Sequence, residues 1–277
     1  MELNRTQLEF YQENGFLLLS ECFSPAEVGR LKAELPALVG EDSPRRVVEK
    51  DGEVVRSIYG AHTINAVFHR LSCHPRIVGP IHQILSSQVY VHQFKINIKS
   101  AFSGDLWDWH QDFIFWQKED GVPTDRLVNV AIFMDEVNEF NGPIFLIPRS
   151  HSEGTLATPA RKNSDAAGDS VYKNSPPWIS NLTAEIKYSV DTRIVSQLVR
   201  RFGIVAPKGV GGSVLFFHCN LVHASPNNIS PFNRVIAFAT YNSIENVPVT
   251  SDHRRPDFLC GRDYTPLVTV SDSALLF

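Results

Sequence analysis

Hydrophobic and polar residues alternate along residues 89–99, and this period of two predicts one long β-strand. One face of the strand would be mainly apolar, while the other would carry Gln93, Lys95 and Asn97. An ordinary half-exposed strand gives the same pattern, so the polar face could meet either solvent or a pocket. Apolar runs predict further strands at residues 16–19, 107–113, 128–134, 144–147, 212–217 and 235–241.

Helix signals lie before and between these strands. Residues 6–9 have capping-box spacing and begin a short helix that Gly15 can end. Residues 24–27 repeat the signal with Ser24 as the cap, and Pro36 should end that helix near residue 35. We also expect a hairpin over residues 45–59 and helices at 65–71, 75–85 and 191–201. The predicted fold is therefore mainly β with flanking helices.

Candidate chemistry lies in the aromatic run at residues 107–113, where His110 and Asp112 are two positions apart. Residues i and i+2 of a strand point to the same side, so both side chains would face one cavity. A neutral imidazole and a carboxylate are two of the three ligands of the facial triad that binds non-haem Fe(II). On its own, such a pair is more often a hydrogen-bonded His and Asp beside a core than part of a metal site.

A third ligand would have to come from His218 or His223, which both follow the glycine-led apolar run at 212–217. A spacing of five gives opposite faces of a strand, so at most one of them can face the cavity. Arg234 lies eleven residues beyond His223. Its guanidinium could pair bidentately with the far carboxylate of 2-oxoglutarate. The His110–Asp112 pair, a later histidine and then Arg234 follow one another in the order that such an enzyme needs. This order favours an iron site over a chance occurrence of the His–Asp pair.

The chain resembles the phytanoyl-CoA dioxygenase superfamily, in particular its branch of ectoine hydroxylases and small amino-acid hydroxylases. The matching segments run in order over nearly the whole chain, at residues 11–16, 90–97, 109–113, 116, 119–121, 140–143, 147–151, 218–225, 234 and 241–243. The resemblance implies a double-stranded β-helix (a cupin-like jelly roll). It also implies an Fe(II)- and 2-oxoglutarate-dependent dioxygenase that uses O2.

The resemblance also implies roles for individual residues. It selects His223 over His218, so that His110, Asp112 and His223 form the catalytic metal site. The cosubstrate 2-oxoglutarate would be bound by Arg234, Ser225, Gln93, Asn97 and Lys95, and the substrate by Trp116, Phe113, Gln93 and Ile236. His151 is interpreted as structural. Arg149 replaces a glycine that the ectoine-type pattern leads us to expect, which affects the shape of that turn.

The largely apolar segment 113–117, which replaces a more polar stretch in ectoine-type enzymes, and Ile236 favour an aliphatic substrate, because a desolvated polar group without a partner is costly. We therefore expect hydroxylation of a free L-amino acid of leucine type, as in natural product biosynthesis. Ectoine or proline hydroxylation is the alternative. Phytanoyl-CoA is disfavoured because no cluster of Lys and Arg suits its phosphates. An alternative of another class is a non-catalytic metal- or ligand-binding jelly roll.

Length, composition and charge indicate the number of domains, the kind of partner and the cellular location. The 277 residues are within reach of a single domain spanning 1–277, and a net charge of −4 gives no sign of nucleic-acid binding. There is no signal-peptide pattern and no long apolar run, so we expect a cytoplasmic protein without a membrane partner, either monomer or homodimer. The four cysteines lack metal-ligand spacing and are expected to be reduced. Residues 152–181 are predicted to form a lid-like insertion.

Overall fold

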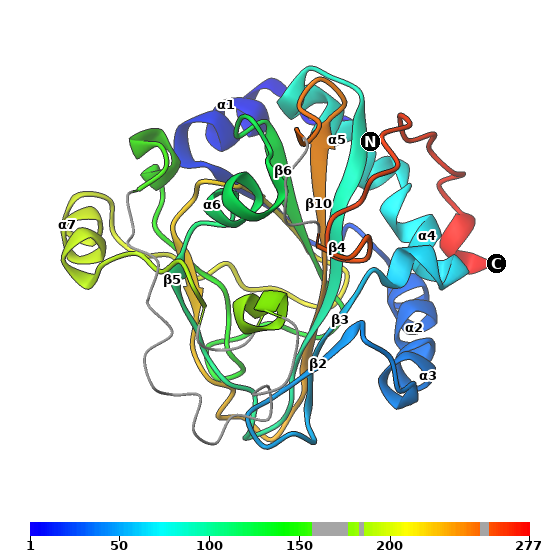
Figure 1. The fold of residues 1–277 in the computed structure, drawn as a ribbon. Coiled ribbons are helices and arrows are strands. Elements are labelled where there is room, and N and C mark those ends of the chain that lie inside the picture. Colours follow the sequence, from blue (N-terminus) through cyan, green and yellow to red (C-terminus); the bar gives the residue numbers. More distant parts are fainter. Residues whose placement is uncertain (157–176, 183–185, 250–254) are drawn as a thin grey trace.

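The computed structural model describes residues 1–156, 177–182, 186–249 and 255–277, and they form two antiparallel β-sheets with helices outside them (Figure 1). The large sheet has the order β1-β8-β6-β10-β4-β3-β2 and the small sheet the order β5-β9-β7. The large-sheet strands are Phe16–Leu19 (β1), Arg46–Val48 (β2), Val55–Tyr59 (β3), Val89–Lys99 (β4), Leu127–Phe133 (β6), Val214–His218 (β8) and Arg234–Ser243 (β10). The small sheet consists of Trp107–His110 (β5), Phe145–Leu146 (β7) and His223–Ser225 (β9). This is the predicted jelly roll.

Helices pack mainly on the side of the large sheet that faces away from β5, as Figure 1 shows for α2, α3 and α4. The α-helices are Arg5–Asn14 (α1), Pro25–Ala33 (α2), Leu35–Gly40 (α3), Ala66–Ser72 (α4), Pro75–Leu85 (α5), Phe113–Phe115 (α6) and Thr192–Phe202 (α7). A π-helical turn, Trp116–Asp120, follows α6, and short 3-10 turns lie at Ala61–Thr63, Ser150–Glu153, Pro177–Leu182 and Ala274–Leu276.

Helix ends follow the capping chemistry of the sequence, with one shift. Ser24 caps α2 in a capping box, and Glu34 separates α2 from α3, so Pro36 acts as predicted. The predicted start of α1 was wrong by two residues: the N-cap is Asn4 rather than Thr6, and its side chain accepts from the Gln7 backbone N–H. Gly15 ends α1 with φ 78°, a left-handed conformation that glycine adopts without strain.

Strand β4 has the predicted bounds and lies inside the large sheet between β10 and β3. Phe94 and Ile96 are fully buried in the main hydrophobic core. The opposite face carries Gln93, Lys95 and Asn97 into a cavity between the sheets. The half-exposed alternative is therefore wrong, and the polar face of β4 faces a pocket.

Strand β5 is shorter than its aromatic run predicted, because it ends at His110. Asp112 has helical backbone angles, φ −75° and ψ −35°, and precedes α6. Strand alternation thus does not bring His110 and Asp112 together, and that part of the prediction was wrong. A turn out of β5 places the carboxylate instead.

The expectations about membrane-spanning segments and about the cysteines can be compared with the described residues. Among them, no helix combines the length and apolar character needed to cross a membrane. Cys22, Cys73, Cys219 and Cys260 form no disulfide among the described residues, and all but Cys22 are buried.

Candidate active site

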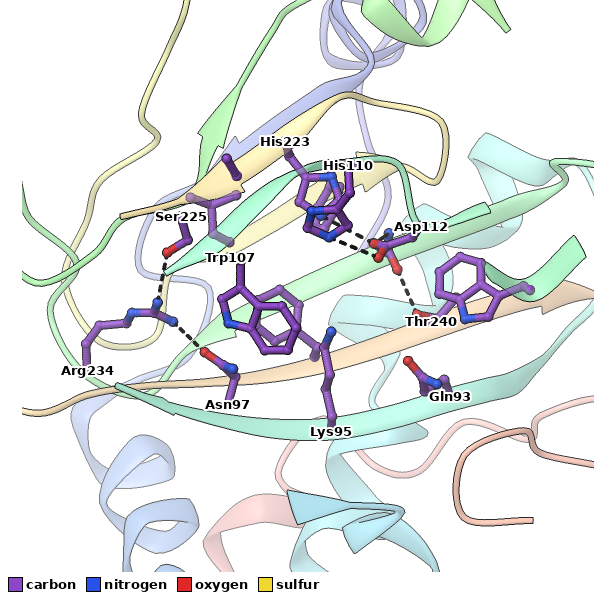
Figure 2. A pocket seen from close by; sticks show the side chains of 16 residues that line it. Gln93, Lys95, Asn97, Trp107, His110, Asp112, His223, Ser225, Arg234 and Thr240 are labelled. Atoms are coloured by element: carbon purple, nitrogen blue, oxygen red, sulfur yellow. Dashed lines mark hydrogen bonds and ion pairs between the residues drawn. The ribbon is translucent and has the colours of Figure 1, made fainter. Parts of the chain in front are cut away.

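Three side chains meet in the space between the sheets: His110 at the end of β5, Asp112 just beyond it and His223 at the start of β9 (Figure 2). Their candidate ligand atoms all lie within 4.8 Å of one another. His110 Nε2 is 3.6 Å from Asp112 Oδ1, and His223 Nε2 is 3.5 Å from Asp112 Oδ2. Two imidazoles and one carboxylate in such a group match the ligand set of a facial triad.

Backbone carbonyls fix the orientation of both imidazoles. His110 Nδ1–H donates to the Asp108 carbonyl at 2.6 Å, and His223 Nδ1–H donates to the Leu221 carbonyl at 2.9 Å. With Nδ1 protonated, each neutral ring keeps its Nε2 lone pair for a metal. The carbonyls therefore preset the tautomer that metal binding requires.

The carboxylate of Asp112 is oriented from the large sheet. Asn129 Nδ2 on β6 donates to Asp112 Oδ2 at 2.8 Å, and Thr240 Oγ1 on β10 donates to Asn129 Oδ1 at 2.7 Å. Sequence reasoning missed both residues. The signal that could have found them is a buried amide and a hydroxyl inside otherwise apolar strands.

Electrostatics favour the protonation states that a divalent metal binds at two of the three groups, Asp112 and His223. Burial opposes ionisation of Asp112, but the imidazoles of His223 and His110 lower its pKa below the usual range. Burial and the neighbouring His110 lower the pKa of His223 to about 4, so this imidazole is neutral at pH 7. The donor set, its tautomers and its charge all fit ferrous iron.

A guanidinium stands at the other end of the cavity. Arg234 donates to Asn97 Oδ1 at 3.2 Å, to Ser225 Oγ at 3.4 Å and to the Gly142 carbonyl at 2.8 Å (Figure 2). Its side chain is 1% exposed. Burial lowers the pKa of Arg234 to about 9, and the group stays charged at neutral pH. A buried guanidinium therefore lies in the same cavity as the His–Asp–His group, where it could pair with a carboxylate.

The cavity between these two ends has about 580 Å³ of empty space, part of it open to solvent, and is lined from both sheets. Its mixture of apolar walls and a few polar groups is typical of a small-ligand site. Its wall is made of Gln93, Lys95, Asn97, Trp107, His110, Asp112, Trp116, Asn129, Ile144, Phe217, His223, Ala224, Ser225, Arg234, Phe238 and Thr240. A second pocket shares its central residues and continues past the His–Asp–His group to Tyr59, Phe115, Leu182, Ile186 and Arg255.

Most of the residues predicted for the site therefore line one cavity, but two do not. Phe113 is 4% exposed and packs in a small cluster with Leu127 and Cys219. Ile236 is fully buried in a second cluster, between the pocket-lining Arg234 and Phe238. Neither lines a pocket, so the residue beside Arg234 no longer argues for an aliphatic substrate.

The other histidines near the site lie outside it. His218 ends β8, and its ring centroid is 5.1 Å from that of His151. His151 Nε2 lies 3.2 Å from the Gln12 carbonyl, which agrees with a structural role. Arg149 has φ 66°, so the turn keeps the left-handed conformation for which a glycine was expected.

The predicted lid falls mostly at residues 157–176, outside the described part of the chain. Near its end, Leu182 is buried and lines the second pocket together with Ile186. Other pocket residues that sequence reasoning missed are Trp107, Phe115 and Arg255. Trp107 and Phe115 lie within the segments 107–113 and 113–117, but neither was predicted to be a site residue, and no site residue was predicted in the C-terminal stretch that contains Arg255.

The fold and the site define a non-haem iron dioxygenase that depends on 2-oxoglutarate. The chain belongs to the phytanoyl-CoA dioxygenase (PhyH) family, whose family model matches residues 11–236. This finding confirms the family resemblance seen in the sequence.

Two curated relatives are similar over nearly the whole chain. L-proline trans-4-hydroxylase of Streptomyces griseoviridis is 36% identical over 265 residues, covering 96% of this chain and 95% of that protein. Ectoine dioxygenase of Streptomyces anulatus is 34% identical over 267 residues, covering 94% of this chain and 86% of that protein. These relatives are named enzymes, which argues against the non-catalytic alternative. They favour the proline or ectoine alternative over a leucine-type hydroxylase.

A solved structure agrees with the fold and the class. EctD from S. alaskensis, crystallised with 2-oxoglutarate and 5-hydroxyectoine, superposes with a TM-score of 0.80 at 29% identity, covering 97% of this chain and 87% of that one. The same enzyme with bound Fe gives a TM-score of 0.78. The carbocyclase SnoK, at 20% identity and a TM-score of 0.67, shares the fold.

Proposed function

We propose that this enzyme hydroxylates an unactivated C–H bond of a small free cyclic amino acid of the proline or ectoine type. The observation that carries the proposal is the cavity that joins the His110–Asp112–His223 group to Arg234. The full-length similarity to a proline hydroxylase and to ectoine dioxygenases supports the cyclic class.

In this proposal His110, Asp112 and His223 hold Fe(II). Their Nδ1 and carboxylate partners keep the metal-binding atoms turned toward one another. Bound iron supplies the oxidative chemistry, in which 2-oxoglutarate, O2 and the C–H bond yield succinate, carbon dioxide and the alcohol. The protein contributes the orientation of the reactants and the exclusion of water.

The cosubstrate 2-oxoglutarate would lie along the cavity with its far carboxylate at Arg234. Ser225 and Asn97 already lie against this guanidinium and would add hydrogen bonds to the same carboxylate. Lys95 lies between the two ends, with its ammonium 5.2 Å from the Phe238 ring centroid and 5.4 Å from that of Trp107. Its charge favours an anionic cosubstrate.

The amino acid would occupy the second pocket, on the other side of the metal group. Gln93 supplies a polar contact there, and its amide is fixed by donation to the Leu259 carbonyl at 2.8 Å. Trp116 and Phe115 are rigid aromatic walls for a small ring. Phe113 and Ile236 have no contact role in this proposal.

The test is incubation of the iron-loaded protein with 2-oxoglutarate and, separately, L-proline, ectoine and L-leucine. Succinate is measured together with a product heavier by one oxygen atom. We expect both with L-proline or ectoine, and neither with Asp112→Ala. Substrate-dependent turnover with L-leucine alone would overturn the cyclic class, and no turnover with any amino acid would overturn the proposed function.

A further inference from the structure

Trp107 belongs to both pockets, and its position links them. It lines the cosubstrate cavity and the second pocket. Its backbone pairs with Ser225, beside Arg234, and it lies three residues before His110 on the same strand. Figure 2 shows the indole between the Arg234 end and the imidazoles. A displaced indole would therefore change the shape of both pockets at once.

The face of this indole is covered by a buried guanidinium. Arg56, on β3, places its guanidinium carbon 3.8 Å from the Trp107 ring centroid, and its side chain is 1% exposed. A flat guanidinium stacked on an indole is a favourable cation–π arrangement, and a lysine does not reproduce it. Arg56 itself lines neither pocket.

Glu49 holds Arg56 in place and ties both residues to the strand that carries Trp107. Arg56 Nη1 donates to Glu49 Oε2 at 2.9 Å, and Nη2 donates to the Leu106 carbonyl at 2.7 Å. Glu49 Oε1 accepts the Asp105 backbone N–H at 3.1 Å. The pair thus forms hydrogen bonds with the backbone on the N-terminal side of Trp107 and stacks on the Trp107 ring.

Burying an ion pair is costly, and apolar residues of similar size often stabilise a protein as well or better. What the Arg56–Glu49 pair provides here is orientation, because it contacts the backbone of Asp105 and Leu106 and the ring of Trp107, three consecutive residues. We propose that Arg56, held by Glu49, is a positioning residue that fixes Trp107 as the wall shared by the two pockets. Consumption of 2-oxoglutarate thereby stays coupled to hydroxylation, an outcome that rests on the proposed function.

The experiment measures succinate formed per hydroxylated product for Arg56→Met, Trp107→Phe and the double variant. Misplacing reactants by about an ångström can cost around a hundredfold, so we expect Arg56→Met to raise this ratio by about tenfold. Trp107→Phe should raise it as well. If Arg56 acts through the indole, adding Arg56→Met to Trp107→Phe changes the ratio little, since coupled residues are not additive.

Arg76→Met is the matched control. Arg76 also stacks on an aromatic ring, 5.3 Å from the Phe23 centroid, and pairs with Glu27 and Asp272, but it lines neither pocket. We expect this variant to lower the thermal unfolding midpoint without changing the ratio. Glu49→Gln keeps the acceptor for the Asp105 N–H and should shift the ratio less than Arg56→Met, which preserves a test if Arg56→Met does not fold.

A second measurement uses iron-free protein and does not depend on the reaction. Acrylamide quenching of tryptophan fluorescence, corrected with Trp107→Phe, reports access to Trp107. Arg56→Met should increase this quenching and Arg76→Met should not. An unchanged ratio and unchanged quenching in Arg56→Met, or ratio effects of Arg56→Met and Trp107→Phe that multiply, would overturn the proposal. If no amino acid is hydroxylated by the wild type, the proposed function fails while the quenching result still decides the positioning role.

Discussion

Two groups of side chains of metal-binding types lie inside this protein, and they differ in whether an arginine of the protein already pairs with the carboxylate. The open group is His110, Asp112 and His223, and the closed group is His92, Asp120 and Cys260. In the second group, His92 Nε2 lies 3.2 Å from Asp120 Oδ2, and Arg255 donates to both oxygens of Asp120 at 2.7 and 2.6 Å. In the first, no guanidinium is paired with Asp112 among the described residues, and the imidazole Nε2 atoms face a cavity.

The comparison shows that residue types alone do not define a metal site. Burial opposes ionisation of Asp120, but Arg255 and His92 lower its pKa to about 2, so its charge is already compensated inside the protein. Asp112 lies near two imidazoles, the Asn129 amide and, further away, the Lys95 ammonium, and none of its ion pairs among the described residues is with a guanidinium. The first group can therefore hold a metal. The second group packs against the pocket wall at Trp116, whose ring centroid lies 5.6 Å from that of His92.

The largest expected effect comes from Asp112→Ala. It removes the anionic member of the open group, so we expect iron binding and turnover to be lost. The loss should exceed the roughly 10- to 100-fold effects of changing residues that only orient ligands. Iron content after gel filtration and succinate release measure it, and far-UV circular dichroism should remain that of the wild type. Turnover that persists would show that Asp112 is not a ligand.

The counterpart in the closed group is Asp120→Asn, which leaves Arg255 buried without its charge partner. Breaking a buried pair in this way costs about 3–5 kcal/mol of folding free energy. We therefore expect a marked fall in the unfolding midpoint in urea, with the iron content of the folded protein unchanged. Loss of iron from folded protein would mean that the two groups are not as different as the structure indicates.

Sequence reasoning reached the open group but not the reason for its geometry. The motif and the family resemblance selected His110, Asp112 and His223, yet strand alternation was the wrong cause, since Asp112 follows the end of β5. The pocket face of β4 could be predicted because alternation is a local property. The roles of Asn129, Thr240 and Arg255 could not be predicted, although the first two stand out as polar residues in apolar strands, because each role arises only through contacts made across the fold.

Arg234→Ala tests the proposed cosubstrate end of the cavity that contains the open group. Because a hydrogen bond to a charged group contributes about 1.5–3 kcal/mol, we expect the KM for 2-oxoglutarate to rise by about tenfold or more. The KM for the amino acid should change much less. Steady-state kinetics with each reactant varied in turn measure both values, and equal increases would count against the assigned role.

A smaller effect is expected for Asn129→Ala, which removes a hydrogen bond to Asp112 but leaves all three proposed ligands in place. A change in a group that orients a ligand typically costs 10- to 100-fold in metal affinity, and we expect a value near the lower limit of roughly tenfold. Titration of the iron-free protein with Fe(II) under anaerobic conditions measures it. Thr240→Val, one contact further away, should have a weaker effect in the same direction.

The central claim is tested most directly by anomalous diffraction at the iron edge from crystals grown anaerobically with Fe(II) and 2-oxoglutarate. We predict one strong anomalous peak within bonding distance of His110 Nε2, His223 Nε2 and the Asp112 carboxylate. A peak beside His92, Asp120 and Cys260 instead, or none at the first position, would contradict the account.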